Sequence, residues 1–314
     1  MLLRSFLCLV LWMLAYSALA DELSPSAADA KDLMVIAFPD WKGASKNAAE
    51  ETSGGFVTRT FHTPIEDHKA SWPWLAPGGV NAKVGTLLPF EVRPLQVVSL
   101  DPAHVVLITL GAVDAEKAEM RCNYSCLISI GTYFFTSSDH GWRVSKRVDV
   151  AAAAYASVSP TEAKIENWPG HGRVLSILIG NQAQGRSTHD VILLGLQPDR
   201  LLPMLGTSIG EDDGGEGVGE LTDEDGNVLS CGDALDPKFV LPEGAEFDGD
   251  CRSSDGSWKF VGDSVEFEFH GTTRKATGGE TLPPLQHWKS GAILTLQKDG
   301  SLKLVKGTLP SYGI

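Results

Sequence analysis

The sequence predicts an all-β fold in which hairpins repeat along the chain and helix is scarce. Three observations support this prediction. Short runs of alternating apolar and polar residues recur from Val84 onward, turns that contain Asp, Pro or Gly separate them, and 33 glycines and 17 prolines are spread over 314 residues. Such hairpins can form a β-propeller-like array or a β-sandwich, and their uneven spacing fits either arrangement.

Residues 1–20 are typical of a secretory signal peptide. Arg4 supplies a positive charge, an apolar run extends from Phe6 to Ala15, and Ala18-Leu19-Ala20 is a cleavage site with small residues. The apolar run is shorter than the roughly 20 residues that a membrane-spanning helix needs. We therefore expect a periplasmic or secreted protein without a membrane span in its mature chain.

Residues 21–80 are expected to form an N-terminal leader and loop-rich segment. Short strands are predicted at Met34 to Phe38 and at Phe56 to Thr63, where apolar residues gather or alternate. The Pro- and Gly-rich stretch around Trp72 and Trp74 is expected to be irregular. These two tryptophans either anchor a partner or fold their own loop onto the core.

Residues 81–314 are predicted to form a β-rich domain. Ala112 to Arg121 is the one helical candidate, because it lacks Pro and Gly, while Ala151 to Ala156 is too short to form a helix alone. Each predicted hairpin closes at a short polar turn. The predicted strands are Val92 to Leu100, Val105 to Leu110, Cys126 to Thr136, Trp142 to Val150, Arg173 to Ile179, Asp190 to Leu196, Leu201 to Leu205, Trp258 to Val261, Ser264 to Phe269, Ala292 to Gln297 and Leu302 to Val305.

A short motif occurs twice in this domain. The pattern L-x-L-Q-x-D-x-x-L spans Leu194 to Leu202 and again Leu294 to Leu302. Each copy is predicted to be a strand, a tight turn and a second strand. The shared letters are few, so ordinary hairpin chemistry explains them as well as a true repeat does.

The stretch 211–268 carries the net charge of the protein. It holds eighteen acidic residues and three basic ones, Lys238, Arg252 and Lys259, while the rest of the chain after residue 20 has 22 of each kind. Its many glycines favour a helix-free insertion. Cys231 and Cys251 lie within it, so we expect a disulfide to bracket this acidic insertion. This charge excludes nucleic acid and anionic membranes as main partners, because both repel an acidic surface.

Four cysteines remain after the signal peptide. An even number in an oxidising compartment favours two disulfides, and local pairing of Cys122 with Cys126 and of Cys231 with Cys251 closes the shortest loops. The spacings do not match the paired pattern of a structural zinc site.

Ser208 lies in a G-x-S-x-G motif, the pattern of a nucleophile elbow. That elbow needs a strand before the serine and a helix after it. Here the motif runs into Glu211, Asp212 and Asp213, which place negative charge where an oxyanion would form. A strand end flanked by glycines is the alternative interpretation.

Asp248, Asp250 and Asp255 are candidate calcium ligands. Calcium binds clustered carboxylate and carbonyl oxygens, and glycine turns lie close by. The spacing does not fit an EF-hand, so the alternatives are an irregular site and a solvated acidic surface. No other cofactor is expected.

These observations lead to a functional hypothesis of an exported, non-catalytic binding protein, an inhibitor or immunity-type protein that neutralises a basic envelope enzyme or toxin. A concentrated acidic surface attracts a basic partner and speeds its association. The alternatives are a serine hydrolase that uses Ser208 and a calcium-stabilised β scaffold for envelope structure or adhesion. The oligomeric state is left open. The residues expected to contact the partner are Asp212, Asp213, Glu216, Glu220, Asp223, Asp225, Trp72 and Trp74.

Overall fold

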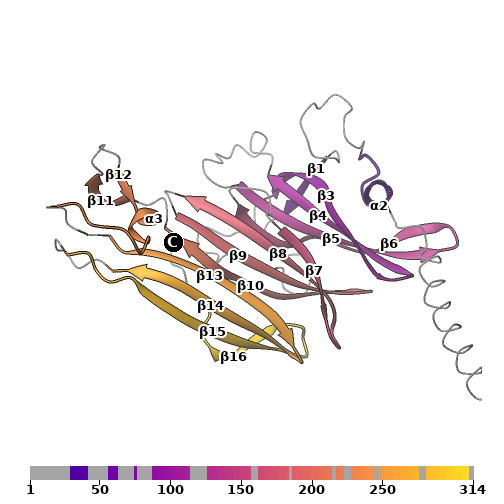
Figure 1. Cartoon of the computed structure of the whole chain (residues 1–314). Coiled ribbons are helices and arrows are strands. Elements are labelled where there is room, and N and C mark those ends of the chain that lie inside the picture. The colour runs from indigo at the N-terminus through magenta and orange to yellow at the C-terminus, as the bar shows by residue number, and fades with distance from the viewer. Residues whose placement is uncertain are drawn as a thin grey trace, which may run out of the picture.

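The protein is mostly β in the computed structural model, as the sequence predicts, and two antiparallel sheets make up most of it (Figure 1). The structure describes residues 29–41, 56–62, 74–75, 87–113, 126–156, 162–183, 186–213, 217–222, 228–243, 247, 249–275 and 281–310. Within these residues, no helix is long and apolar enough to cross a membrane.

The first sheet has six strands in the order β1-β3-β4-β5-β6-β2. Four of them form consecutive hairpins, so that the chain meanders from one strand to its neighbour. The strands are β1 (Val57–His62), β2 (Trp74–Leu75), β3 (Leu87–Asp101), β4 (His104–Val113), β5 (Cys126–Ser138) and β6 (Gly141–Ala156).

The second sheet has eight strands in the order β16-β15-β14-β13-β10-β9-β8-β7. It too is a meander, except that a small two-stranded sheet and a short helix are inserted between β10 and β13. The strands are β7 (Glu162–Trp168), β8 (Gly172–Ala183), β9 (Arg186–Gln197), β10 (Arg200–Asp212), β13 (Cys251–Val261), β14 (Ser264–Arg274), β15 (Gln286–Leu296) and β16 (Leu302–Gly307); the inserted elements are β11 (Gly217–Thr222), β12 (Val228–Ser230) and α3 (Cys231–Ala234).

The prediction of a strand at Met34 to Phe38 is wrong, because this segment belongs mostly to helix α2 (Ala30–Ala37). Asp29 caps the helix, and its side chain accepts a hydrogen bond from the Lys31 amide at 2.9 Å. Leu33, Met34 and Ala37 form one buried helical face. A short apolar run has no clear period, so the sequence alone does not separate a strand from a buried helix.

Other elements differ from the prediction over shorter lengths. The β7 strand was not predicted, Trp74 and Leu75 form a short strand in a stretch expected to be irregular, and α3 lies in a stretch expected to be helix-free. The candidate helix from Ala112 begins inside β4, and its remainder lies outside the described residues. The other predicted strands are confirmed, most of them with longer bounds.

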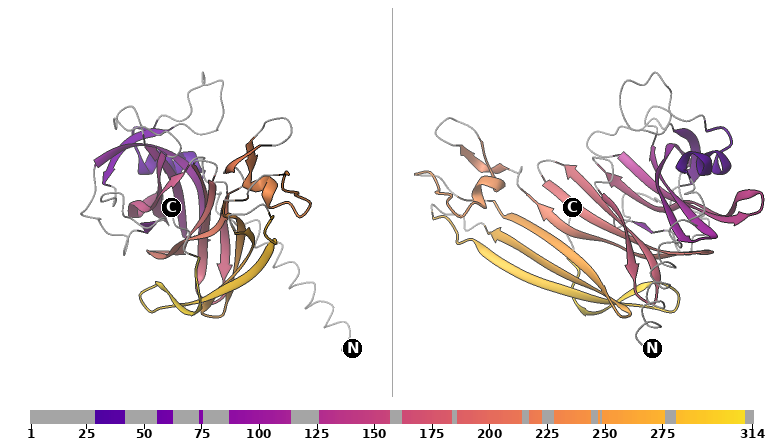
Figure 2. Two further views of the ribbon diagram at one scale, coloured as in Figure 1. Left: turned by 90° about the vertical axis from the view of Figure 1, so that its left-hand side faces the viewer. Right: turned by 45° about the vertical axis from the view of Figure 1, so that its right-hand side comes forward.

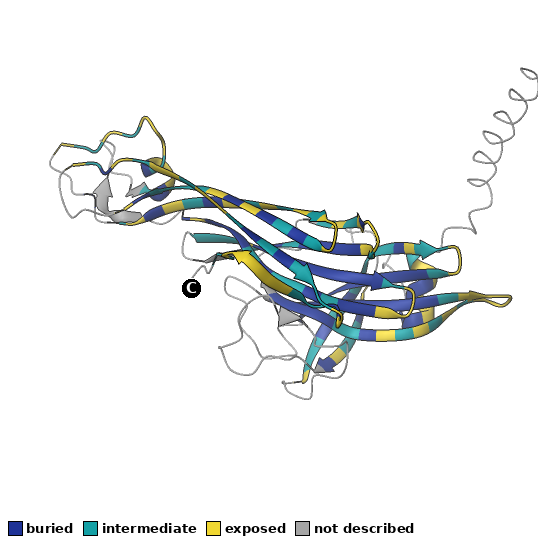
Figure 3. Ribbon diagram, turned by 90° about the horizontal axis from the view of Figure 1, so that it is seen from below, coloured by how far each residue is buried: buried dark blue, intermediate teal, exposed yellow. Residues whose placement is uncertain are grey.

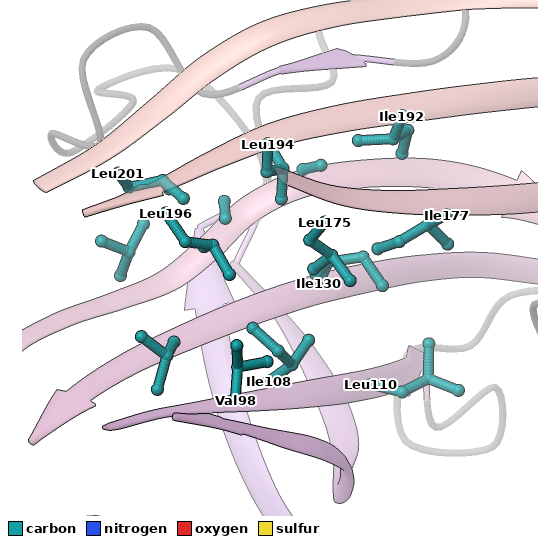
Figure 4. Close-up of a cluster of buried hydrophobic side chains, with 14 of the residues drawn as sticks. Val98, Ile108, Leu110, Ile130, Leu175, Ile177, Ile192, Leu194, Leu196 and Leu201 are labelled. Atoms are coloured by element: carbon teal, nitrogen blue, oxygen red, sulfur yellow. The ribbon is translucent and has the colours of Figure 1, made fainter. Parts of the chain in front are cut away.

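Two layers of buried side chains explain how the sheets pack. One hydrophobic cluster lies between the six-stranded sheet and β7–β10, and Figure 4 shows Ile108 and Ile130 of one sheet facing Leu175 and Ile177 of the other. A second cluster, which includes Leu193, lies on the opposite face of β7–β10. The strands β8 and β9 therefore form a middle layer, buried on both faces.

The sequence of β9 matches this position in the middle. Its residues Asp190 to Leu196 are all buried, whereas a strand with one solvent-facing side alternates. Figure 3 shows the contrast with the outer strands, where buried and exposed residues alternate. Burial on both faces also means that a substitution here disturbs two packed layers at once.

The eight-stranded sheet curls into a half-barrel, so that β13–β16 turn toward the free face of β7–β10. The Trp168 indole nitrogen of β7 donates to the Gly262 carbonyl in the β13–β14 turn at 2.6 Å. Glu166 of β7 accepts a hydrogen bond from the Trp258 indole nitrogen of β13 at 3.1 Å. These contacts join strands that are not neighbours in the sheet order.

The two copies of the repeated motif meet across this curl. Their turns close the β9–β10 and β15–β16 hairpins, and Arg200 in the first donates to the Asp299 carbonyl in the second at 3.1 Å. Gly300 lies directly against Leu202 and has a positive φ of 92°. The two copies of the motif are therefore in direct contact. The predicted propeller-like array or sandwich is not confirmed as the arrangement of the hairpins.

Helix α2 covers the other face of the six-stranded sheet (Figure 2). Phe38, at the end of the helix, packs edge-on against Tyr133 of β5, with ring centroids 5.0 Å apart. Arg147 of β6 donates to the Ala37 carbonyl at 3.1 Å and lies over the Phe38 ring. The helix therefore packs directly onto the six-stranded sheet.

Candidate functional site

The acidic stretch divides into two structural parts. Residues from Cys251 to Glu268 form β13 and the first half of β14, so they belong to the half-barrel itself. The inserted part lies between β10 and β13 and contains β11, β12 and α3; we call it the acidic lobe. In Figure 2 the lobe lies at the end of the half-barrel far from α2.

Two arginines and two buried carboxylates lie where β10 leads into the lobe. Arg186 of β9 contacts Asp213 at 2.9 Å and Glu211 at 3.1 Å. Arg252 of β13 contacts the same carboxylates at 3.8 and 3.6 Å. The acid side chains are 0% and 2% exposed, whereas the arginines are 36% and 44% exposed. Charge neutralisation by the arginines is what allows the two carboxylates to be buried.

The predicted disulfide between Cys231 and Cys251 is confirmed, with a Cα–Cα distance of 5.2 Å. It forms a small core with Ala234 and Phe247 inside the lobe. Ser230 caps α3 and forms a reciprocal capping box with Asp233. The lobe is thus folded and covalently attached to the start of β13.

A buried arginine, Arg274 of β14, also binds the lobe through hydrogen bonds. The Arg274 guanidinium donates to the carbonyls of Ala234 and Pro283, each at 2.5 Å, and to the Asp236 carbonyl at 3.3 Å. Because a guanidinium has five donors in a rigid plane, one side chain can tie β14 to two separate loops. Arg274 therefore fixes the orientation of α3 against the sheet.

A cleft lies beside the lobe on β13, β14 and β15, and we call it the Trp288 cleft. It is a hollow of about 450 Å³ on the face of the sheet that carries Ser254 and Trp288. A neighbouring hollow of about 420 Å³ is lined mainly from the opposite face, by residues such as Asp255, His270 and Lys289. Ser254, Gly271 and Trp288 are direct neighbours across three strands. Arg252 and Asp250 line the 450 Å³ hollow. Because Arg252 also contacts Glu211 and Asp213, this hollow lies next to the arginine–carboxylate network.

Ser208 lies within strand β10 and not on an elbow before a helix. Its hydroxyl donates to Asp190 on β9, directly opposite. Burial raises the pKa of the Asp190 carboxyl, while the hydrogen bond from Ser208 opposes this rise. Among the hydrogen bonds of the described residues, Ser208 has no histidine partner. This geometry does not favour a serine nucleophile.

The remaining predicted site residues are distributed as follows. Asp212 is exposed at the end of β10, whereas Asp213 faces the arginines. Asp250 and Asp255 are exposed, and the described residues contain no group of three or more His, Cys, Asp or Glu that could hold a metal. Residues Trp72, Cys122, Glu216, Asp223, Asp225 and Asp248 lie outside the described part of the chain, as do the side chains of Trp74, Cys126 and Glu220.

Several residues at this end of the molecule were not identified from the sequence. Arg252 had a signal, since it is one of only three basic residues in the acidic stretch. Arg186, Asp190, Arg274 and Trp288 had none, because their partners come from distant parts of the chain.

Comparison with known proteins finds no family model, no curated protein and no solved structure that matches this chain.

Proposed function

We propose that this protein is an exported, non-catalytic binding protein whose acidic lobe neutralises a basic protein, as an inhibitor or an immunity-type protein does. The observation that carries the proposal is that the lobe is a folded unit, held by the Cys231–Cys251 disulfide and by Arg274. An acidic tail that only improved solubility would need neither attachment.

The charges of this region divide into structural and surface groups. Glu211 and Asp213 are buried against arginines and serve the fold. Asp236, Glu243 and Asp250 are exposed, and they lie on a lobe with a fixed orientation. Fixed carboxylates lose little conformational freedom when a partner binds, which favours affinity as well as fast association.

A catalytic role receives less support from the same geometry. Ser208 donates to a buried carboxyl within a strand pair, and no histidine lies in hydrogen-bond contact with it among the described residues. A hydroxyl in that position lacks a general base and a helix N-terminus. We therefore place the function on the surface of the lobe.

The test is capture of a partner by the mature protein from an envelope extract of the source organism. A triple variant of the lobe, Asp236→Asn, Glu243→Gln and Asp250→Asn, removes three charges while keeping the side-chain shapes. We expect it to lose capture of a basic protein that the wild type retains at low salt and releases at high salt.

The matched control removes three exposed charges far from the lobe, with Asp32→Asn, Asp139→Asn and Asp199→Asn. It has the same net charge as the lobe variant, so it separates a local docking surface from a general effect of charge. Equal loss of capture in both variants, or capture that survives the lobe substitutions, would contradict the proposal.

A further inference from the structure

We propose that the basic partner of the acidic lobe is a peptidase and that Val240 is the central contact residue of the lobe. The peptidase binds residues 238–242 as it binds an extended peptide substrate. This inference rests on the proposed function, because it names the class of protein that the lobe neutralises. It depends on one exposed apolar side chain, on the fixed backbone around it and on the charges nearby.

Val240 points away from the lobe into solvent. Its side chain is 78% exposed, whereas Phe239 and Leu241 on either side are half-buried and pack against the small core of the lobe. Side chains that point alternately inward and outward have the two-residue period of an extended chain. A single exposed valine is common on protein surfaces, so its significance depends on the backbone that holds it.

The backbone before Val240 is fixed by a turn. The Phe239 amide donates to the Asp236 carbonyl at 3.0 Å, and the Lys238 amide donates to the Asp236 side chain at 2.7 Å. The guanidinium of the buried Arg274 donates to the same Asp236 carbonyl at 3.3 Å. A segment that is held in this way loses little conformational freedom when a partner binds it.

The backbone that follows the turn is unpaired. Among the hydrogen bonds of the described residues, none involves the amide or the carbonyl of Val240 or Leu241, and Pro242 then restricts the chain. Free backbone groups on an extended segment can pair with a strand edge of a partner, while a pocket receives the outward side chain. The substrate cleft of a serine peptidase offers such a pocket for one side chain of an extended peptide.

The charges around this segment suit a basic enzyme. Asp236 and Glu243 flank it in sequence, Asp250 lies near the disulfide, and all three are exposed. Lys238 is the one basic residue between positions 211 and 250, so the surface stays negative. A positive rim around the pocket of the enzyme would therefore be attracted to the lobe and would associate faster.

Val240 also sets the expected specificity. A small aliphatic side chain fits the small pocket of an elastase, whereas trypsin accepts a basic side chain and chymotrypsin a large apolar one. Lys238 would suit trypsin and Phe239 would suit chymotrypsin, but Lys238 belongs to the turn and Phe239 packs against the core of the lobe. We therefore expect a partner with an elastase-like pocket.

The test measures inhibition of elastase, trypsin and chymotrypsin by the full mature protein, with chromogenic peptides as substrates. We expect inhibition of elastase at about 1 μM or lower and weaker inhibition of the other two enzymes. Val240→Lys should weaken inhibition of elastase by about thirtyfold or more, as loss of a central contact residue does. The same variant should inhibit trypsin better than the wild type does, because the pocket of trypsin accepts lysine.

The matched control is Val35→Lys, which places the same charge on another exposed valine, on α2 far from the lobe. It should inhibit elastase as the wild type does. The inference is overturned if elastase is not inhibited, or if Val240→Lys and Val35→Lys inhibit it equally. It is also overturned if elastase cleaves the Val240–Leu241 bond with loss of inhibition, since the segment is then only a substrate. Capture of another basic protein that depended on Asp236, Glu243 and Asp250 would leave the proposed function intact.

Discussion

Replacement of Arg274 by methionine should loosen the contact between α3 and the sheet and lower the stability of the whole protein. Arg274 is 5% exposed, and its guanidinium donates to three backbone carbonyls. Methionine has a similar length and no donor, so it fills the space and leaves these carbonyls without their partner. The change therefore tests the hydrogen bonds and not a cavity.

The expected loss is about 4 kcal/mol. Each buried carbonyl left without a donor costs about 1–3 kcal/mol, and part of this is recovered when the loops at Ala234 and Pro283 relax toward water. For a protein of this size, such a loss lowers the melting temperature by roughly 10 °C. Arg274→Lys should lose about half as much, since one ammonium group cannot reach all three carbonyls.

The measurement is urea and thermal unfolding followed by circular dichroism at neutral pH. The control is Arg200→Met, which removes an arginine that donates to a single carbonyl at an exposed turn and should cost under about 1 kcal/mol. If Arg274→Met costs no more than Arg200→Met, or if lysine is as damaging as methionine, the assigned role of the guanidinium is wrong.

Two further predictions concern other parts of the half-barrel. The unfolding free energy of Asp190→Asn should increase relative to that of the wild type as the pH rises from 4 to 8, because burial raises the pKa of Asp190. Each unit of that rise corresponds to about 1.4 kcal/mol. Because the pKa of Asp190 is raised in the folded protein, the wild type loses stability as the carboxyl ionises, and asparagine does not. A difference in unfolding free energy between the two proteins that did not change with pH would contradict this prediction. Replacing Cys231 and Cys251 by serine should cost about 3 kcal/mol in urea unfolding, since the bridge closes a loop over 20 residues. With a reductant present, the wild type and the double serine variant should be equally stable. If they are equally stable without a reductant, the prediction is refuted.

The strands and their hairpins were predictable because their signals are local. The alternation of apolar and acidic residues in β14 can be recognised without knowledge of distant residues. As expected, Val265, Phe267 and Phe269 are buried, whereas Glu266 is half-buried and Glu268 is exposed. The disulfide Cys231–Cys251 was predictable for a similar reason, since the two cysteines are close in sequence. Helix α2 was missed because its apolar run is short and its buried face is defined by the sheet beneath it.

The candidate site was predictable only in part. The charge of the acidic stretch is visible in the composition, but its division into buried Asp213 and exposed Asp212 depends on Arg186, which approaches from another strand. Trp288 gave no signal, because its orientation depends on the absence of a side chain at Gly271, a residue seventeen positions earlier.

The sequence alone determined the all-β class, most strands, the location of the charge and one disulfide. Each of these follows from residues that are neighbours in the chain, because alternation, turn chemistry and short loop closure act locally. Only the tertiary structure decided how the eight-stranded sheet curls, which carboxylates are neutralised and where a cleft forms. Those features depend on contacts between strands far apart in sequence, such as Trp168 with Gly262 and Arg252 with Glu211, and no local pattern specifies such pairs.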